Sequence, residues 1–274
     1  MTSLTSRQFY WSIRRELWEN RYLFLAPLAV AAAILAGYLI NAFTSRVSML
    51  VVGSVGIGSP YAMAGGLLIC TGCMIGAYYC VDALYGERRD RAILFWKSLP
   101  VSDRLTVLSK ASIPLIVLPA IVFVIMIATH LALLALEAAS GGFARLHVLL
   151  LVKVWIAVLY GLAAIALWHA PIFGWLLLVS AWARRSVLLW VLLPPIAIGI
   201  LERIVFNTAH FAQFLQYRCL GWFTEAFNQR GPCCVPDPLK ILTPARFFAS
   251  PGLWFGLAAA VIFLAGAARL RRSR

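Results

Sequence analysis

Six apolar segments of the chain are each long enough to cross a membrane as a helix. A hydrocarbon core of about 30 Å takes roughly 20 helical residues. The segments lie at about 22–43, 61–84, 112–137, 150–181, 186–206 and 252–269. The fourth exceeds one straight crossing, so we expect it to tilt, kink at Pro171 or project beyond the bilayer. The sequence therefore predicts an all-α integral membrane protein with a single transmembrane domain over residues 1–274.

The composition excludes an ordinary soluble domain, because 62% of the 274 residues are hydrophobic and only 12% are charged. Lys and Arg outnumber Asp and Glu by 24 to 10, a balance that nucleic-acid-binding proteins also show. Here the basic residues are spread between apolar spans instead of forming one basic surface. We therefore expect the lipid bilayer, and no nucleic acid, as a partner.

The positions of the basic residues predict the orientation. Four lie in 7–21, six in 88–110, two at 184–185 and four in 269–274, which is sixteen of the 24. Cytoplasmic loops carry an excess of Lys and Arg. We therefore expect both termini in the cytoplasm.

Residues 7–21 predict an amphipathic helix in the plane of the lipid headgroups. Phe9, Ile13 and Leu17 recur every four residues, and Trp11 and Trp18 suit the membrane interface. On this pattern the charged residues lie on the other sides of the helix: Arg14, Arg15, Glu16 and Glu19. The alternative is a basic lead-in to the first span.

The longest polar insertion on the predicted cytoplasmic side is the loop at 85–110. It opens with a mixed-charge run of Glu87, Arg88, Arg89, Asp90 and Arg91. An apolar group with helical spacing follows: Ile93, Leu94, Trp96 and Leu99. Pro100 ends this short helix, and Ser102 or Asp103 can cap the next one. Such a helix suits docking into a groove of a cytoplasmic partner, and the alternative is a loop lying in the headgroups.

This loop resembles the first cytoplasmic loop of permease subunits of the type-2 ABC exporter family. The matching residues are Glu87-Arg88, Pro100-Val101-Ser102 and Lys110, which stands where the family often has a Lys. Arg91-Ala92 replaces the Gly-Thr of the family pattern, and Leu94 replaces an acid.

The resemblance implies a bacterial inner-membrane exporter in which two permease subunits, identical or sister chains, pair around a central pathway. Two copies of an ABC ATPase subunit, which bind the ATP and Mg²⁺, would sit beneath them. The residues from Glu87 to Pro100 would then form the coupling helix. It also implies an interfacial helix before the first span and short re-entrant helices before the last.

Two stripes of small residues could let helices approach closely. One contains Gly72 and Gly76 in the second span, and the other contains Gly252 and Gly256 in the sixth. Each could line a subunit interface, although packing inside one subunit is the simpler interpretation. Cys70 and Cys73 show CxxC spacing but have no neighbouring His or acid, so we predict no metal site there.

Ionisable residues inside the spans are candidates for the pathway or its gates, because they are costly in a membrane. They are His130, Glu137, Lys153, His169, Glu202 and Arg203. Glu137 and Lys153 are expected at similar depth near the outer face and could pair. A lone histidine also commonly bonds a neighbouring helix.

The segment 207–251 is the largest outer region. Its residues 210–227 are rich in aromatics and predict a helix at, or dipping into, the outer interface. Cys219 could form a disulfide with Cys233 or Cys234 if this face is oxidising, and free thiols are the alternative.

The sequence contains no GxxxxGK[ST] nucleotide-binding loop and no convincing catalytic grouping. We therefore predict a transport subunit without enzymatic activity or cofactor of its own, exporting an amphiphilic substrate such as a peptide, drug or lipid. Two alternatives stay open. One is a haem-binding anchor of a redox complex that uses His130 and His169 as axial ligands. The other is a membrane-embedded transferase that uses Glu137, His169 or Glu202.

Overall fold

The computed structural model describes residues 2–44, 60–89, 102–139, 144–228 and 237–272, and nearly all of them are helical. The long helices are α2 (Tyr22–Thr44), α3 (Pro60–Asp82), α7 (Leu118–Ala139), α8 (Ala144–Trp182), α9 (Val187–Phe206) and α12 (Pro251–Arg272). The shorter elements are α1 (Thr2–Glu19), α4 (Tyr85–Arg89), α6 (Asp103–Ser112), the π-helix η2 (Ile113–Val117), α10 (His210–Ala226), the 3₁₀-helix η3 (Pro238–Ile241) and α11 (Pro244–Ala249). Within these ranges the only β-type pairing is a bridge between Phe227 and Leu242.

Six helical segments are long and apolar enough to cross a membrane, which confirms the predicted fold class. They are Tyr22–Ala42, Pro60–Arg89, Asp103–Ala139, Leu149–Trp182, Val187–Phe206 and Pro251–Arg271. The third runs through α6, η2 and α7 without a break. The fourth, within α8, continues through Pro171, and the 39 residues of α8 extend about 58 Å at 1.5 Å per residue. Since that length is nearly twice the hydrocarbon core, α8 either tilts strongly or projects from the bilayer.

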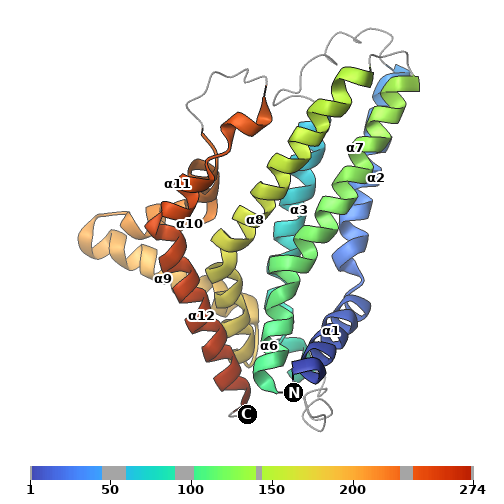
Figure 1. Cartoon of the computed structure of the whole chain (residues 1–274). Helices are drawn as coiled ribbons and strands as arrows, with labels where there is room; N and C mark the ends of the chain where they lie inside the picture. The colour runs from blue at the N-terminus through green and yellow to red at the C-terminus, as the bar shows by residue number, and fades with distance from the viewer. Residues whose placement is uncertain (1, 45–59, 90–101, 140–143, 229–236, 273–274) are drawn as a thin grey trace.

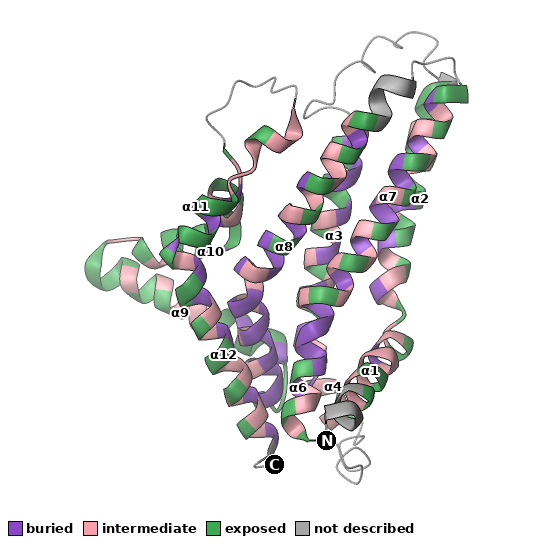
Figure 2. Ribbon diagram, in the orientation of Figure 1, coloured by how far each residue is buried: buried purple, intermediate pink, exposed green. Residues whose placement is uncertain are grey.

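Both termini lie at the same end of the bundle, as six crossings require (Figure 1). We call this end the termini side and the other end the opposite side. The termini side carries α1, α4, α6 and the end of α12 (Figures 1 and 2). The opposite side carries the end of α7 and the start of α8, while α9 and α10 project from the flank of the bundle (Figure 1).

The main core forms where α3, α7 and α8 face one another. Leu68, Met126 and Leu177 are fully buried there. Figure 2 shows the buried positions concentrated on the facing sides of these helices. Helix α9 differs, because most of its apolar side chains are exposed. In a bilayer such a face contacts lipid or another membrane subunit.

Both small-residue stripes pack inside the chain. A Cβ atom at Gly72 would lie 2.9 Å from Val122 Cγ2, so this glycine allows α3 and α7 to approach. Gly76 faces Leu118 and Phe173 in the same way. A Cβ at Gly256 would overlap the guanidinium of Arg218.

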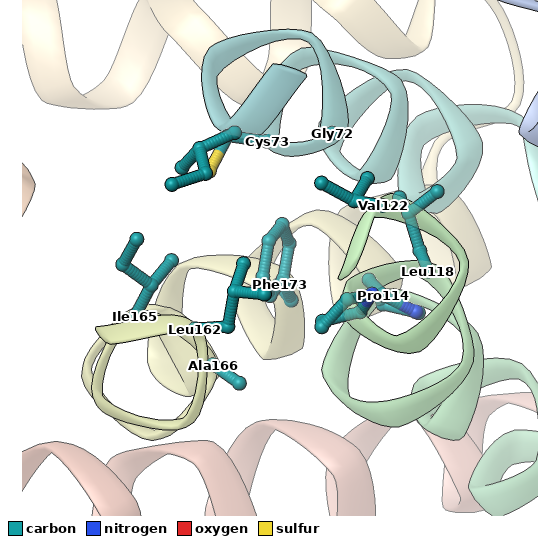
Figure 3. A pocket seen from close by; sticks show the side chains of 11 residues that line it. Gly72, Cys73, Pro114, Leu118, Val122, Leu162, Ile165, Ala166 and Phe173 are labelled. Atoms are coloured by element: carbon teal, nitrogen blue, oxygen red, sulfur yellow. The ribbon is translucent and has the colours of Figure 1, made fainter. Parts of the chain in front are cut away.

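The space left where α3, η2, α7 and α8 meet is small and apolar. Figure 3 shows side chains including Cys73, Pro114, Val122 and Phe173 around it. Its volume is about 20 Å³, room for about one water molecule. This part of the bundle therefore offers no passage for a solute.

Candidate functional site

Six charged side chains from four separate elements meet on the termini side and form what we call the ion cluster. Its members are Arg15 and Glu16 of α1, Glu87 of α4, Asp103 and Lys110 of α6, and Arg271 of α12. Three of these six are acidic and three are basic, and the half-exposed Glu19 also pairs with Arg15, with 3.6 Å between Arg15 Nε and Glu19 Oε1. It joins the two described ends of the polar loop, at Arg89 and Ser102, to the first and last helices of the chain.

Lys110 lies between two carboxylates. Its Nζ atom is 2.8 Å from Glu16 Oε1 and 3.1 Å from Glu87 Oε1. The Lys110 and Glu16 side chains expose only 3% and 1% of their surfaces. Buried charges of this kind depend on their partners, because removing one partner leaves the other uncompensated.

Arg271 connects the last helix to both ends of the loop. Its Nη1 atom donates to Glu87 Oε2 at 2.6 Å, and its Nε atom donates to Asp103 Oδ1 at 3.0 Å. The planar guanidinium suits this arrangement, because its donors diverge in fixed directions. The start of α6 and the loop-side end of α3–α4 are thereby held together through α12.

Glu16 is the most buried member of the cluster. Its Oε2 atom accepts a hydrogen bond from Tyr79 Oη at 2.7 Å, and its Oε1 atom accepts one from Arg15 Nη2 at 2.8 Å. Burial alone would raise the pKa of the Glu16 carboxyl. The Lys110 ammonium, with hydrogen bonds from Lys110, Tyr79 and Arg15, outweighs burial and holds the pKa below its ordinary value of 4.5. Glu16 is therefore ionised at neutral pH.

Arg88 fixes the same region to the end of α8. It donates to the backbone carbonyl oxygens of Ser180 and of Ala183, the latter at 2.9 Å. Ser180 Oγ in turn accepts hydrogen bonds from the backbone N–H groups of Leu84 and Tyr85 at 3.2 and 3.0 Å. The turn that leads from α3 into the loop is thus held on α8 from both directions.

An open cavity of about 360 Å³ adjoins the ion cluster. Its wall includes Glu16, Glu19, Asp82, Glu87 and Lys110. A polar, open cavity at one end of the bundle gives water access to the edge of the cluster. The cluster therefore belongs to the boundary of the membrane domain and not to its hydrocarbon interior.

Only part of the predicted coupling segment falls in the described residues. Glu87 belongs to the ion cluster, Arg88 holds α8, and Arg89 is exposed at the end of α4. The other predicted coupling residues lie outside the described residues: Asp90, Arg91, Ile93, Leu94, Trp96, Leu99 and Pro100.

A second buried polar group lies on the opposite side. His130 Nδ1 accepts a hydrogen bond from Trp155 Nε1 at 3.1 Å, and its Nε2 lies 3.1 Å from the carbonyl oxygen of Tyr61. The neutral tautomer with the proton on Nε2 satisfies both contacts. Tyr61 Oη donates to Glu137 Oε2 at 2.7 Å. His130 thus bonds the neighbouring helices α3 and α8, the alternative that the sequence left open for a lone histidine.

The suggested ion pair between Glu137 and Lys153 does not form in the structure. Lys153 Nζ instead lies 3.2 Å from Asp237 Oδ2, and that hydrogen bond lowers the pKa of Asp237. Glu137 is directed to Tyr61 of α3. Similar depth in two neighbouring helices does not make these side chains point toward one another.

The remaining membrane candidates have distinct surroundings. His169 Nδ1 and Nε2 lie 3.0 and 3.1 Å from the carbonyl oxygens of Ile165 and Cys219. Glu202 binds the N-terminal turn of α10: its carboxylate accepts hydrogen bonds from Thr208 Oγ1 and from the backbone N–H groups of His210 and Phe211, at 2.7–2.8 Å. Arg203 is exposed on α9. Glu202 and Arg203 are consecutive residues of α9, whereas His169 lies on α8 and faces backbone carbonyl groups of α8 and α10.

The cysteine predictions are tested only in part. Cys219 is exposed and forms no disulfide within the described residues, whereas Cys233 and Cys234 lie outside them. Their pairing stays a prediction. In the part of the chain that the structure describes, no three His, Cys, Asp or Glu side chains are grouped as metal ligands would be.

Sequence reasoning missed most of the ion cluster. It assigned Glu16 to a polar side of the first helix, whereas the structure buries it against Lys110 and Tyr79. The signal was present, because Ile13, Glu16, Leu17 and Asn20 share one helical face at the spacing i, i+3, i+4, i+7. Arg271 and Asp103 had no comparable local signal, since 168 positions separate them.

Comparisons of the chain with protein-family models, curated proteins and solved structures find no match.

Proposed function

We propose that this chain is the membrane-spanning subunit of an ATP-driven exporter of the type-2 ABC class, in the bacterial inner membrane with the termini side in the cytoplasm. The observation that carries the proposal is the attachment of the polar loop. Both of its ends are fixed by buried ion pairs and hydrogen bonds to α1, α8 and α12. A force applied to the loop would reach these helices directly, as a coupling segment requires.

In this proposal a second protein binds and hydrolyses ATP, because this sequence has no nucleotide-binding loop. ATP and Mg²⁺ would be bound by two ATPase subunits beneath the membrane domain. Their closure would move the Glu87–Pro100 segment and, through the ion cluster, the spans attached to it.

The pathway would lie between two membrane subunits, as the resemblance implies. The cavity where α3, η2, α7 and α8 meet has a volume of about 20 Å³, too small for a solute, which supports a pathway outside a single bundle. The exposed apolar residues of α9 provide a surface that a second subunit could contact. A pathway lined by the apolar residues of α9 would favour an amphiphilic substrate such as a peptide, drug or lipid.

The haem anchor and the transferase receive less support. In His130 and in His169 each ring nitrogen lies against a hydrogen-bonding group of the protein, and an axial histidine would have to give up one of these two contacts to bind iron. Glu137 bonds Tyr61, and Glu202 bonds the start of α10. These hydrogen bonds give the candidate acids and bases structural roles.

A photo-crosslinking amino acid at Arg89, the exposed residue at the start of the loop, tests the proposal in cells that naturally make the protein. Mass spectrometry of the adduct should identify a nucleotide-binding ATPase. The matched position is Arg203, exposed on α9, where the same probe should not capture that ATPase. Adducts with lipid alone at Arg89 would contradict a docking role for the loop.

A further inference from the structure

A groove of about 420 Å³ runs between α9 and α10 on the flank of the bundle. Its walls are largely apolar and include Pro195, Ile196, Gly199, Ile200, Ala212 and Leu215. Gly199 widens the groove, because a Cβ at this position would reach only Phe211 Cδ1, at 4.0 Å. The groove lies on a predicted span, so its natural surroundings are acyl chains.

A cation stands at one end of this groove. Arg203 lines it, is exposed, and makes no ion pair with any residue that the structure describes. Glu202 also lines the groove and keeps its negative charge, but its carboxylate accepts hydrogen bonds from the backbone N–H groups of His210 and Phe211 at the N-terminus of α10, where the positive end of the helix dipole offsets part of that charge. A basic side chain near the end of a span is stabilised by an anion at the level of the headgroups.

The spacing of the cation and the apolar wall fits a lipid. Arg203 follows Pro195 by eight residues, which is about 12 Å along a helix. One leaflet of the hydrocarbon core is about 15 Å deep, half of the full 30 Å. A phosphate at Arg203 therefore leaves an apolar wall of nearly one leaflet for the chain attached to it.

We infer that the groove between α9 and α10 holds one acyl chain of an anionic phospholipid, with the lipid phosphate bound by Arg203. The lipid would fill the angle between the span α9 and the returning helix α10. This inference does not depend on the proposed transport function.

Native mass spectrometry of the full chain tests it after reconstitution into bilayer discs with equal amounts of phosphatidylglycerol and phosphatidylcholine. The unmodified chain should retain one phosphatidylglycerol. Arg203→Gln should lower that retention about fivefold, the ratio that ~1 kcal/mol per basic side chain near an anionic surface gives. Gly199→Leu, which fills the groove, should abolish retention, and added inorganic phosphate should not displace the lipid.

Arg185→Gln is the matched control, because Arg185 is an exposed arginine just before α9 and away from the groove. It should retain the lipid as the unmodified chain does. Equal retention in Arg203→Gln and Arg185→Gln would overturn the inference. So would a dimer without bound phospholipid that Arg203→Gln and Gly199→Leu convert to a monomer, because a second copy would then occupy the groove. Since Arg203 is exposed, its variant still tests the inference if Gly199→Leu fails to fold.

Discussion

Arg271 and Glu87 are 184 positions apart in the chain, yet the Nη1 atom of one lies 2.6 Å from the Oε2 atom of the other. Both side chains are largely buried. Through this contact the last membrane helix is bound to the element that leads into the polar loop. Arg271 also binds Asp103 on the far end of that loop, so one guanidinium closes the loop at its base.

Lys110→Met should destabilise the protein by about 3–5 kcal/mol, the range for a buried ion pair that loses one partner. The loss leaves Glu16 buried without its ammonium. Chemical unfolding in a mild detergent, followed by circular dichroism, measures the change. Arg104→Met on the same helix is the control, because Arg104 is exposed. The double variant Glu16→Gln/Lys110→Met should be less destabilised than the sum of the two single variants, and strict additivity would argue against their coupling.

Arg271→Lys should restore only part of the stability that Arg271→Gln loses. A lysine keeps the charge but presents one ammonium, which cannot reproduce the two divergent bonds to Glu87 and Asp103. Thermal unfolding of the two variants beside the unmodified chain checks the order. Equal unfolding temperatures for Arg271→Lys and the unmodified chain would show that the fork geometry is unimportant.

The stability that Glu16 contributes should depend on pH. Its pKa is lower in the folded state than the ordinary 4.5, so the unfolded state binds more protons in acid. The contribution is therefore complete well above pH 4.5 and is lost as the pH falls through the folded-state pKa. Glu16→Gln should differ from the unmodified chain most at pH 7 and least in acid. Burial raises the pKa of the half-exposed Glu19, so Glu19→Gln should not show this trend.

Accessibility labelling tests the predicted orientation. In a variant that keeps only the buried Cys80, single cysteines are introduced as Arg246→Cys on α11 and Arg104→Cys on α6. A membrane-impermeant maleimide should label Arg246→Cys in intact cells and Arg104→Cys only after permeabilisation. The reverse pattern would put the polar loop outside the cell and would end the coupling proposal.

The fold class could be predicted from the sequence because the length of an apolar run is a local property, and this length decides whether a helix can span the bilayer. The direction of individual side chains could not. Charge alone assigns Glu16 to a polar side of its helix, although its spacing from Ile13 places it on the buried face. The pairing of Lys153 with Asp237 joins α8 to a segment 84 positions away, and depth along a span contains no such information.

For the glycine stripes, close packing could be predicted from the sequence, but the packing partner could not. Their small size predicted close packing, and Gly72 indeed meets Val122 on a neighbouring helix. The partner of Gly256 was not predictable, because it is the side chain of Arg218, a buried cation from a different segment.

The π-helical turn Ile113–Val117 separates Lys110 from the core-facing side of α7 within one uninterrupted helix. A π turn holds about one residue more than an α turn. If the same residues wound as a regular α-helix throughout, the two halves would be rotated by about 100° relative to each other, the angle that one residue spans at 3.6 residues per turn. Lys110 would then swing away from Glu16 while Met126 stayed in the core. The winding of this helix, and not merely its length, therefore determines whether Lys110 can reach Glu16 while Met126 packs in the core.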